Sequence, residues 1–359
     1  MNKLLVGTRK GLLILENGAT GWVVKSEHFE GIPVSYATLD TRNNTLWVAL
    51  DHGHWGCKLH RSQDGGVTWE EVEAPKYPAG ATRPPEDNTP AHTSYIWIVQ
   101  PGGDDQPNRL YVGTEPGGLF QSDDNGDSFH LVETLWNQPS RNNWFGGGRD
   151  HPGVCSIIVD PRNSEHITIG ISVGGVYESC DGGQTWEVRN KGLYASYLPD
   201  PYAEFGHDPH YILASASNPD ILWQQNHCGV FRSSNGGHTW DDISTKDGIY
   251  FGFALALDEN DANTAWVIPA LSDELRIPIE RASFVARTED AGKTWQKLRN
   301  GLPQQNSYDI TFRHALHIDG NQLAFGTTSG NVYFSDDRGD NWHRIAQNLA
   351  VVYSVKFFD

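Results

Sequence analysis

The sequence predicts an all-β protein and, within that class, a seven-bladed β-propeller. Three observations support this prediction. An eight-residue pattern that suits a tight hairpin recurs along the chain, and each copy stands in the same order of short strand-like runs. Helical periodicity of apolar residues is absent. The 38 glycines and 13 tryptophans in 359 residues also fit a turn-rich β protein.

The clearest copy of the pattern is Ser179 to Trp186, with the order Ser-x-Asp-x-Gly-x-Thr-Trp. Its Ser and Asp side chains can bond nearby backbone N–H groups, its glycines permit positive φ, and its Trp packs the turn onto the sheet. Five further copies begin at Ser62, Ser122, Ser233, Thr288 and Ser335, and a decayed copy covers Leu15 to Trp22. The closing aromatics are 47 to 60 residues apart. Self-similarity at such a period is typical of propellers and solenoids.

Each repeat contains four strand-like runs, as expected for one propeller blade. In the fourth repeat they are 154–159, 166–170, 175–178 and 186–189. Residues 4–7 match a second strand, whereas residues 351–358 match a first strand. We therefore expect the C-terminal strand to complete blade 1, built from 3–30 plus 350–358, in a single domain of residues 1–359. Such closure also removes open sheet edges.

Charge, apolar runs and cysteine spacing exclude several classes of partner and predict a location. A net charge of −18 argues against nucleic-acid and anionic-membrane partners, which need Lys and Arg. The N-terminal apolar run is too short for a signal sequence, and no apolar run is long enough for a membrane span. The four cysteines lack metal-knuckle or redox spacing. These observations predict a cytoplasmic protein.

The repeated pattern resembles the Asp-box, or BNR, repeat of sialidases and related glycoside hydrolases. The likeness extends over almost the whole chain, which looks most like bacterial sialidase-like, glycosyl hydrolase-like proteins. It implies that the box lies between the third and fourth strands of each blade, on the face opposite the functional loops. The chain departs from sialidases, whose Arg-Ile-Pro motif precedes the first box. Here Arg276 to Pro278 lies late in the chain.

The functional face should therefore hold the loops that enter first strands and the loops that join second to third strands. Four long or polar entering segments are 73–92, 133–153, 190–209 and the stretch around Arg313. The candidate acids, bases and nucleophiles are Glu115, Asp150, His151, Asp208 and His210. The candidate substrate-binding residues are Arg9, His54, Trp55, Arg149, His207 and Arg313, and Trp55, Trp136, Trp144, Tyr197 and Phe205 are candidates for stacking on sugars.

Three interpretations remain open. The first is a carbohydrate-acting, glycoside hydrolase-like enzyme that binds a small molecule or oligosaccharide and uses two of these carboxyls. The second is a metal-dependent lyase or hydrolase, with a divalent transition metal held by His151, His210, His227 and His314. The third is a non-catalytic interaction scaffold, in which each polar residue shapes only its own loop.

Overall fold

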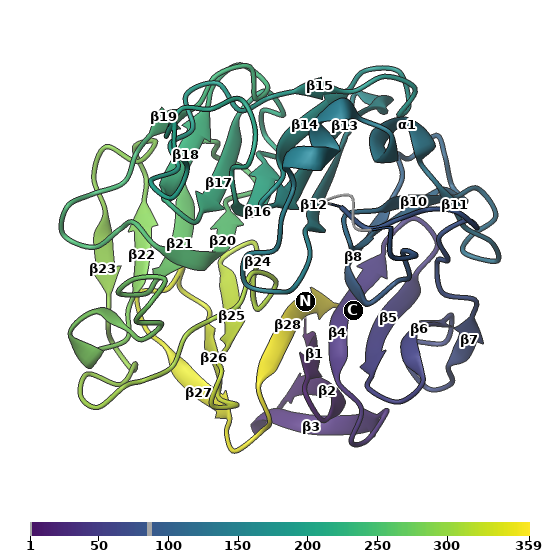
Figure 1. Cartoon of the computed structure of the whole chain (residues 1–359). Coiled ribbons are helices and arrows are strands. Elements are labelled where there is room, and N and C mark those ends of the chain that lie inside the picture. The colour runs from purple at the N-terminus through teal and green to yellow at the C-terminus, as the bar shows by residue number, and fades with distance from the viewer. Residues whose placement is uncertain (1, 85–87) are drawn as a thin grey trace. The chain divides into compact units, whose positions relative to one another are not determined.

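The computed structural model describes residues 2–84 and 88–359 and confirms the predicted fold class, a seven-bladed β-propeller. Its strands form seven antiparallel sheets of four strands each (Figure 1). The predicted entering segment 73–92 includes residues 85–87, which lie outside the described residues. No helix among the described residues is long and apolar enough to cross a membrane.

The first blade contains both ends of the chain, as the sequence predicted. Its order is β28–β1–β2–β3. The C-terminal strand pairs antiparallel with the N-terminal one, from Lys3 opposite Phe358 to Thr8 opposite Val352. The bounds are β1 (Lys3–Thr8), β2 (Gly11–Gly18), β3 (Gly21–His28) and β28 (Val352–Phe358). The decayed copy of the repeat falls on the β2–β3 turn.

The next three blades follow in chain order. The second has β4 (Val34–Asp40), β5 (Thr45–His52), β6 (Gly56–Ser62) and β7 (Glu70–Val72). The third has β8 (Tyr95–Pro101), β9 (Leu110–Glu115), β10 (Leu119–Ser122) and β11 (His130–Leu131). The fourth has β12 (Gly153–Asp160), β13 (Asn163–Ser172), β14 (Gly175–Ser179) and β15 (Glu187–Val188).

The last three blades repeat the same order. The fifth has β16 (Pro209–Ala214), β17 (Leu222–Asn226), β18 (Gly229–Ser233) and β19 (Asp241–Asp242). The sixth has β20 (Gly252–Leu257), β21 (Ala265–Pro269), β22 (Val285–Thr288) and β23 (Gln296–Leu298). The seventh has β24 (Leu316–Asp319), β25 (Gln322–Gly326), β26 (Val332–Ser335) and β27 (His343–Ala346).

Short helical turns interrupt two of the loops, which the search for helical periodicity did not predict. The segment before β12 contains the helix α1 (Glu133–Trp136) and the 3-10 helix η1 (Pro139–Asn143). A second 3-10 turn, η2 (Ile279–Arg281), precedes β22. All three are too short to show a repeating apolar stripe.

The recurring pattern forms the hairpin between third and fourth strands, as expected. In the fourth blade the Ser179 hydroxyl donates to the Asp181 carboxylate and accepts from Gly183 N–H, each at 2.8 Å. Asp181 in turn accepts from the backbone and hydroxyl of Thr185 at 2.8 and 2.6 Å. Gly183 has φ 87°, which a side chain would strain. These bonds lower the pKa of Asp181 to about 2, so the carboxylate stays ionised and the turn stays closed.

The described residues fall into two compact units. Unit 1 comprises the described residues of Met1–Ala37, Leu213–Gly236 and Trp240–Asp359, and unit 2 those of Thr38–Ile212 and Gly237–Thr239. In unit 1 the closing Trp342 packs edge-on against Phe325 of its own blade, at 4.9 Å between ring centroids. Trp342 belongs to an apolar core that also contains Trp266, Leu298 and Leu323. This burial is what anchors the hairpin to the sheet.

Candidate active site

Two acidic side chains stand at equivalent places in consecutive blades of unit 2. Asp51 lies near the end of β5 and Glu115 ends β9, and both of these are second strands. Both acids therefore come from a strand end on the face that leads into the second-to-third loop. Arg149 approaches Glu115 from the loop that enters β12, and its guanidinium bonds the Glu115 carboxylate. This group of Asp51, Glu115 and Arg149 is called the acidic pair site below.

The buried carboxyl of Glu115 is the centre of the acidic pair site. Glu115 is 2% exposed. Burial raises the pKa of Glu115 above its usual range, although the charge and hydrogen bond of Arg149 oppose that shift. Burial also raises the pKa of Asp51, again with Arg149 opposing. One arginine thus balances two acids that burial favours in their protonated forms.

Tyr95 and Cys57 complete the surroundings. The Arg149 guanidinium lies over the Tyr95 ring, at 4.1 Å from its centroid, which holds the arginine by a cation–π contact. Cys57 pairs with Asp51 across the β5–β6 hairpin. Burial, followed by the charge of Asp51, raises the pKa of the Cys57 thiol to about 12. Cys57 is therefore a neutral thiol beside the acids and not a nucleophile at neutral pH.

The turn that follows Glu115 is held rigidly. The Tyr77 hydroxyl bonds Thr114 Oγ1 at 2.8 Å and accepts from Gly118 N–H at 2.9 Å. Thr114 Oγ1 also donates to the Gly118 carbonyl at 3.0 Å. Gly118 has no space for a side chain, because a Cβ would lie 2.3 Å from the Tyr77 hydroxyl. This network fixes the strand end from which Glu115 projects.

His151 and Asp150 follow Arg149 in sequence but differ in their surroundings. His151 is half-buried and its Nε2 lies 3.0 Å from an Arg83 guanidinium nitrogen. A histidine with this partner accepts a hydrogen bond through Nε2, so that nitrogen is already engaged. Asp150 is exposed.

Exposed aromatic side chains lie in the loops of unit 2. Trp55, in the β5–β6 turn close to Asp51 in sequence, is 68% exposed and meets the His54 ring edge-on at 4.6 Å. Phe145 and Tyr197 are each 39% exposed and contact each other.

Two of the predicted stacking residues are core residues instead. Trp144 is fully buried and donates from its indole N–H to the Tyr177 hydroxyl at 2.8 Å. Trp136 is 5% exposed and packs against Tyr77 and Arg141. Their predicted role in stacking on a sugar is therefore wrong. The indoles serve the packing of the segment before β12.

The residues around His210 are closely hydrogen-bonded. Asp208 accepts from the Ser172 hydroxyl at 2.8 Å and from Val173 N–H at 3.1 Å, and its other oxygen lies 3.3 Å from His210 Nε2. Asp208 and His210 are 4% and 2% exposed. His207 is fully buried, its Nε2 bonds the Ala203 carbonyl at 2.7 Å, and burial lowers its pKa. Asp208 thus holds the end of β13.

Four further predicted residues belong to unit 1. Arg9 is exposed in the β1–β2 turn, and its backbone N–H bonds the Val351 carbonyl. His227 faces Asp273, with 3.2 Å between Nε2 and Oδ2. The Arg313 guanidinium lies 5.4 Å from the Phe253 ring centroid. His314 packs edge-on against Tyr36 at 4.9 Å. His227, Arg313 and His314 each have a side-chain partner in their own unit.

Asp51 is the one member of the acidic pair site that the candidate residues omitted. Alignment of the second strands of the repeats would have found Asp51. The run Leu46 to Asp51 matches Leu110 to Glu115, with leucine, an aromatic residue, valine, a small residue, any residue and an acid in the same order. Because the fold repeats, equal places in this register are equal places in the blades. An alignment of the first strands of the blades does not contain this match, because both acids lie on second strands.

The chain is similar to parts of curated xyloglucanases. No family model matches the chain. It is 28% identical over 224 residues to xyloglucanase Xgh74A of Acetivibrio thermocellus, which covers 57% of this chain and 24% of that protein. It is 24% identical over 229 residues to an oligoxyloglucan-reducing end-specific xyloglucanase of Emericella nidulans, covering 63% and 25%. The chain thus spans about a quarter of the length of these relatives.

Solved structures show the same fold. An ancestral GH74 enzyme superposes with a TM-score of 0.59 at 19% identity, over 88% of this chain and 38% of that one. YCF48 from Cyanidioschyzon merolae superposes with a TM-score of 0.54 at 15% identity, over 92% and 94%. At these identities the likeness shows the fold alone, and the site has to carry the argument for function.

Proposed function

We propose that this chain is a carbohydrate-acting enzyme of the glycoside hydrolase type, with the acidic pair site as its catalytic centre. The observation that carries the proposal is the pairing of Asp51 and Glu115 at equivalent strand ends, with raised pKa values and a shared arginine. The similarity to xyloglucanases supports it.

The chemistry needs one protonated carboxyl and one carboxylate. In glycoside hydrolysis a carboxylic acid protonates the leaving oxygen, while a carboxylate attacks the sugar or activates water. Glu115 is the more deeply buried acid, so it is assigned as the proton donor. Asp51, which is half-buried and bordered by the exposed β5–β6 turn, is assigned as the carboxylate. Arg149 holds Glu115 in place and stabilises negative charge when the proton leaves.

The substrate class follows from charge and shape. The net charge of −18 favours a neutral saccharide over an anionic one. Arg149 is already engaged by Glu115, so it is poorly suited to hold the carboxylate of a sialic acid. Trp55 offers a flat apolar surface, on which a pyranose ring can stack. A β-glucan oligosaccharide with neutral branches, as the names of the relatives suggest, meets these conditions.

The finer family assignment belongs to the same proposal. Hydrogen bonds of the kind seen at Ser179 and Asp181 recur at Ser62 and Asp64 and at Ser335 and Asp337. They support membership of the Asp-box repeat family. A sialidase-like activity has no comparable support. The single-domain organisation, the cytoplasmic location and a divalent transition metal at the predicted histidines stay predictions.

The test is hydrolysis of xyloglucan oligosaccharides, cello-oligosaccharides and a sialyl glycoside by the chain with and without EDTA. We expect new reducing ends from a neutral β-glucan, unaffected by EDTA. Glu115→Gln and Asp51→Asn should each lower kcat at least about a hundredfold with little change in KM, because each removes a proton-transfer group. Glu70→Gln is the matched control, since Glu70 pairs with Arg61 outside the acidic pair site.

Three outcomes would contradict the proposal. Full activity in Glu115→Gln would remove the assigned acid. Activity abolished by EDTA and restored by a transition metal would favour the metal-dependent interpretation. Saturable binding without hydrolysis of any glycoside would favour a non-catalytic scaffold.

A further inference from the structure

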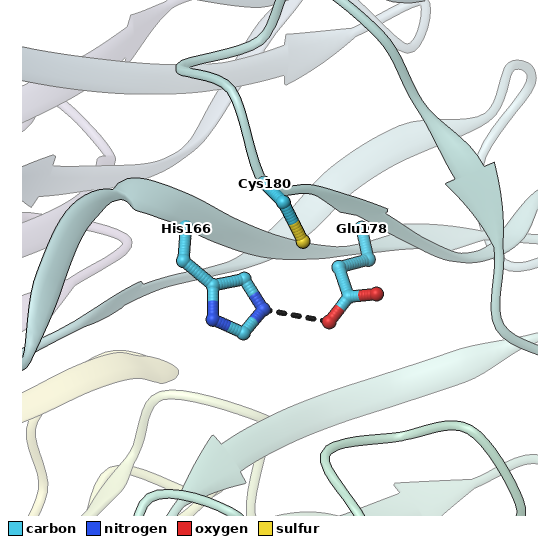
Figure 2. Close-up of side chains that lie close together, drawn as sticks. All are labelled: His166, Glu178 and Cys180. Carbon is cyan, nitrogen blue, oxygen red and sulfur yellow. Dashed lines mark hydrogen bonds and ion pairs between the residues drawn. The ribbon is translucent and has the colours of Figure 1, made fainter.

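A second group of reactive side chains lies in the fourth blade, at the hairpin between third and fourth strands. His166 projects from β13, Glu178 from β14, and Cys180 directly follows β14 (Figure 2). Ile167 pairs with Ser179 in the β13–β14 ladder, so His166 and Cys180 stand next to each other just beyond that pair. One ligand atom from each of the three side chains lies within 4.8 Å of the others.

The imidazole of His166 is oriented by two carboxylates. Its Nδ1 lies 3.2 Å from Asp160 Oδ2, and its Nε2 lies 2.6 Å from Glu178 Oε1. A histidine that binds a metal through Nε2 usually donates Nδ1–H to a carboxylate, which fixes the tautomer and the ring direction. Asp160 is placed for that role. It is itself held by the Arg162 guanidinium.

The charge around His166 favours a cation. Two carboxylates, those of Asp160 and Glu178, lie within hydrogen-bond distance of its ring nitrogens. Their negative charges would attract a metal ion to Nε2. Arg189 opposes this attraction in part, because its guanidinium binds the other oxygen of Glu178, at 2.6 Å, and Glu187. That contact leaves Glu178 Oε1 directed at His166.

Among the complete repeats, only the fourth has both an acid before the box and a cysteine at its second position. The residue that precedes the first box position is Glu178 here, whereas it is Arg61, Arg232 and Arg287 in three other copies. Those arginines bear the opposite charge and exclude a metal at the equivalent places. The second box position is cysteine only at Cys180. A soft thiolate beside an imidazole and a carboxylate is a donor set that suits zinc.

We propose that His166 Nε2, a Glu178 oxygen and Cys180 Sγ bind one Zn²⁺, with water as the fourth ligand. Tetrahedral ligands at typical zinc distances are about 3.3 to 3.6 Å apart. The Nε2–Oε1 distance of 2.6 Å must therefore widen by less than 1 Å, and the sulfur must approach. Cys180 is exposed, so its side chain can turn and its thiol proton can leave to solvent when the metal binds.

This site is independent of the proposed hydrolase function. It lies at the turn that the sequence assigned to the non-catalytic face, and none of its residues belongs to the acidic pair site. Bound zinc would clamp β13, β14 and the turn together, with Asp160 of β12 as a further support. Its water ligand is open to solvent through the exposed Cys180.

The experiment is zinc titration of the tag-free chain, followed by competition with a chromogenic chelator. We expect one Zn²⁺ per chain and at least a tenfold weaker affinity in Cys180→Ser and in His166→Gln. Co²⁺ should give tetrahedral absorption with a thiolate charge-transfer band, which disappears in Cys180→Ser. Cys57→Ser and His60→Ala are matched controls. His60 faces Glu71 at 3.7 Å in the second blade, where the corresponding box residue is Gln63.

The titration also contains the results that would overturn the proposal. Absence of stoichiometric zinc in a folded chain would show that the group is an ion-pair network only. Binding that survives both Cys180→Ser and His166→Gln would place the metal elsewhere. Melting curves of the metal-free variants identify a misfolded protein, and Cys180→Ser should melt like the metal-free wild type because its side chain is exposed. Hydrolase activity is not the readout, so failure here leaves the proposed function untouched.

Discussion

Asp208 is a candidate acid from the sequence, but in the structure its carboxylate accepts hydrogen bonds at the end of β13. A variant can test whether these bonds stabilise the fold. The variant is Asp208→Ala. It removes the acceptor of two buried donors, the Ser172 hydroxyl at 2.8 Å and Val173 N–H at 3.1 Å. Val173 has φ 53°, a left-handed value that β-branched residues rarely adopt. The Asp208 bond therefore stabilises a strained turn at the end of β13.

The magnitude follows from the two donors. A buried donor left without an acceptor costs about 1–3 kcal/mol, so two donors at about 1.5 kcal/mol each give a loss of about 3 kcal/mol. The entropy of unfolding is about 2.1 cal/mol/K per residue, or about 0.75 kcal/mol/K for a chain of this length. The melting temperature should then fall by about 4 °C. Asp208→Asn keeps the Oδ1 acceptor and should lose less than half as much.

Differential scanning calorimetry measures this effect directly. Asp150→Ala is the control, because Asp150 is an exposed neighbour in the candidate set. Its free energy of unfolding should change by no more than about 0.5 kcal/mol. A melting temperature of Asp208→Ala within 1 °C of the wild type, measured under the same conditions, would refute the assigned role of these hydrogen bonds.

Three further predictions concern the loops of unit 2 and the thiols. Because burial raises the folded-state pKa of Glu115 above its ordinary 4.5, the stability it contributes is present at lower pH and is lost as pH rises through the folded pKa. The excess of wild-type unfolding free energy over that of Glu115→Gln should therefore shrink as urea titrations move from pH 4 to pH 8. Trp55→Ala should leave the melting temperature unchanged but raise KM for a neutral oligosaccharide about tenfold, since the indole is exposed; an unchanged KM would exclude stacking there. With a disulfide reagent at pH 8, Cys180 should react first and Cys57, whose pKa is about 12, should stay unmodified in the folded chain, as mass mapping can check.

The sequence predicted those parts of the fold that depend on repetition. The copies around Ser179 set the number of blades and the order of strands, and the terminal runs predicted the pairing of β28 with β1. These features are local patterns multiplied seven times, so errors in one copy are corrected by the others. The helix α1 has no such support, because it occurs once and is only four residues long.

Side-chain partners are harder to predict, because they depend on which loops fold back on one another. Trp144 appears in a polar loop and was expected to face a ligand, yet its indole packs and bonds inside the sheet edge at Tyr177. Asp208 appears as a free acid before a strand, yet β13 supplies its donors. Nothing in either local sequence announces these partners, which lie more than 30 residues away along the chain.

Alignment of the second strands in the seven blades identifies the acidic pair site, which the composition of the loops did not. The place occupied by Asp51 and Glu115 is occupied by Arg9, Ser172, His227, Ala270 and Thr328 in the other blades. A position that serves only the fold should converge on similar residues in every blade, as the Ser, Gly and Trp positions of the turn do. This position instead carries acids in two consecutive blades and five different residue types elsewhere. Variation at a structurally equivalent strand end shows that packing does not dictate the side chain there. This variation supports the proposed role of the two acids in binding a ligand, and the charge of Arg149 opposes the pKa shift that burial imposes on both carboxyls.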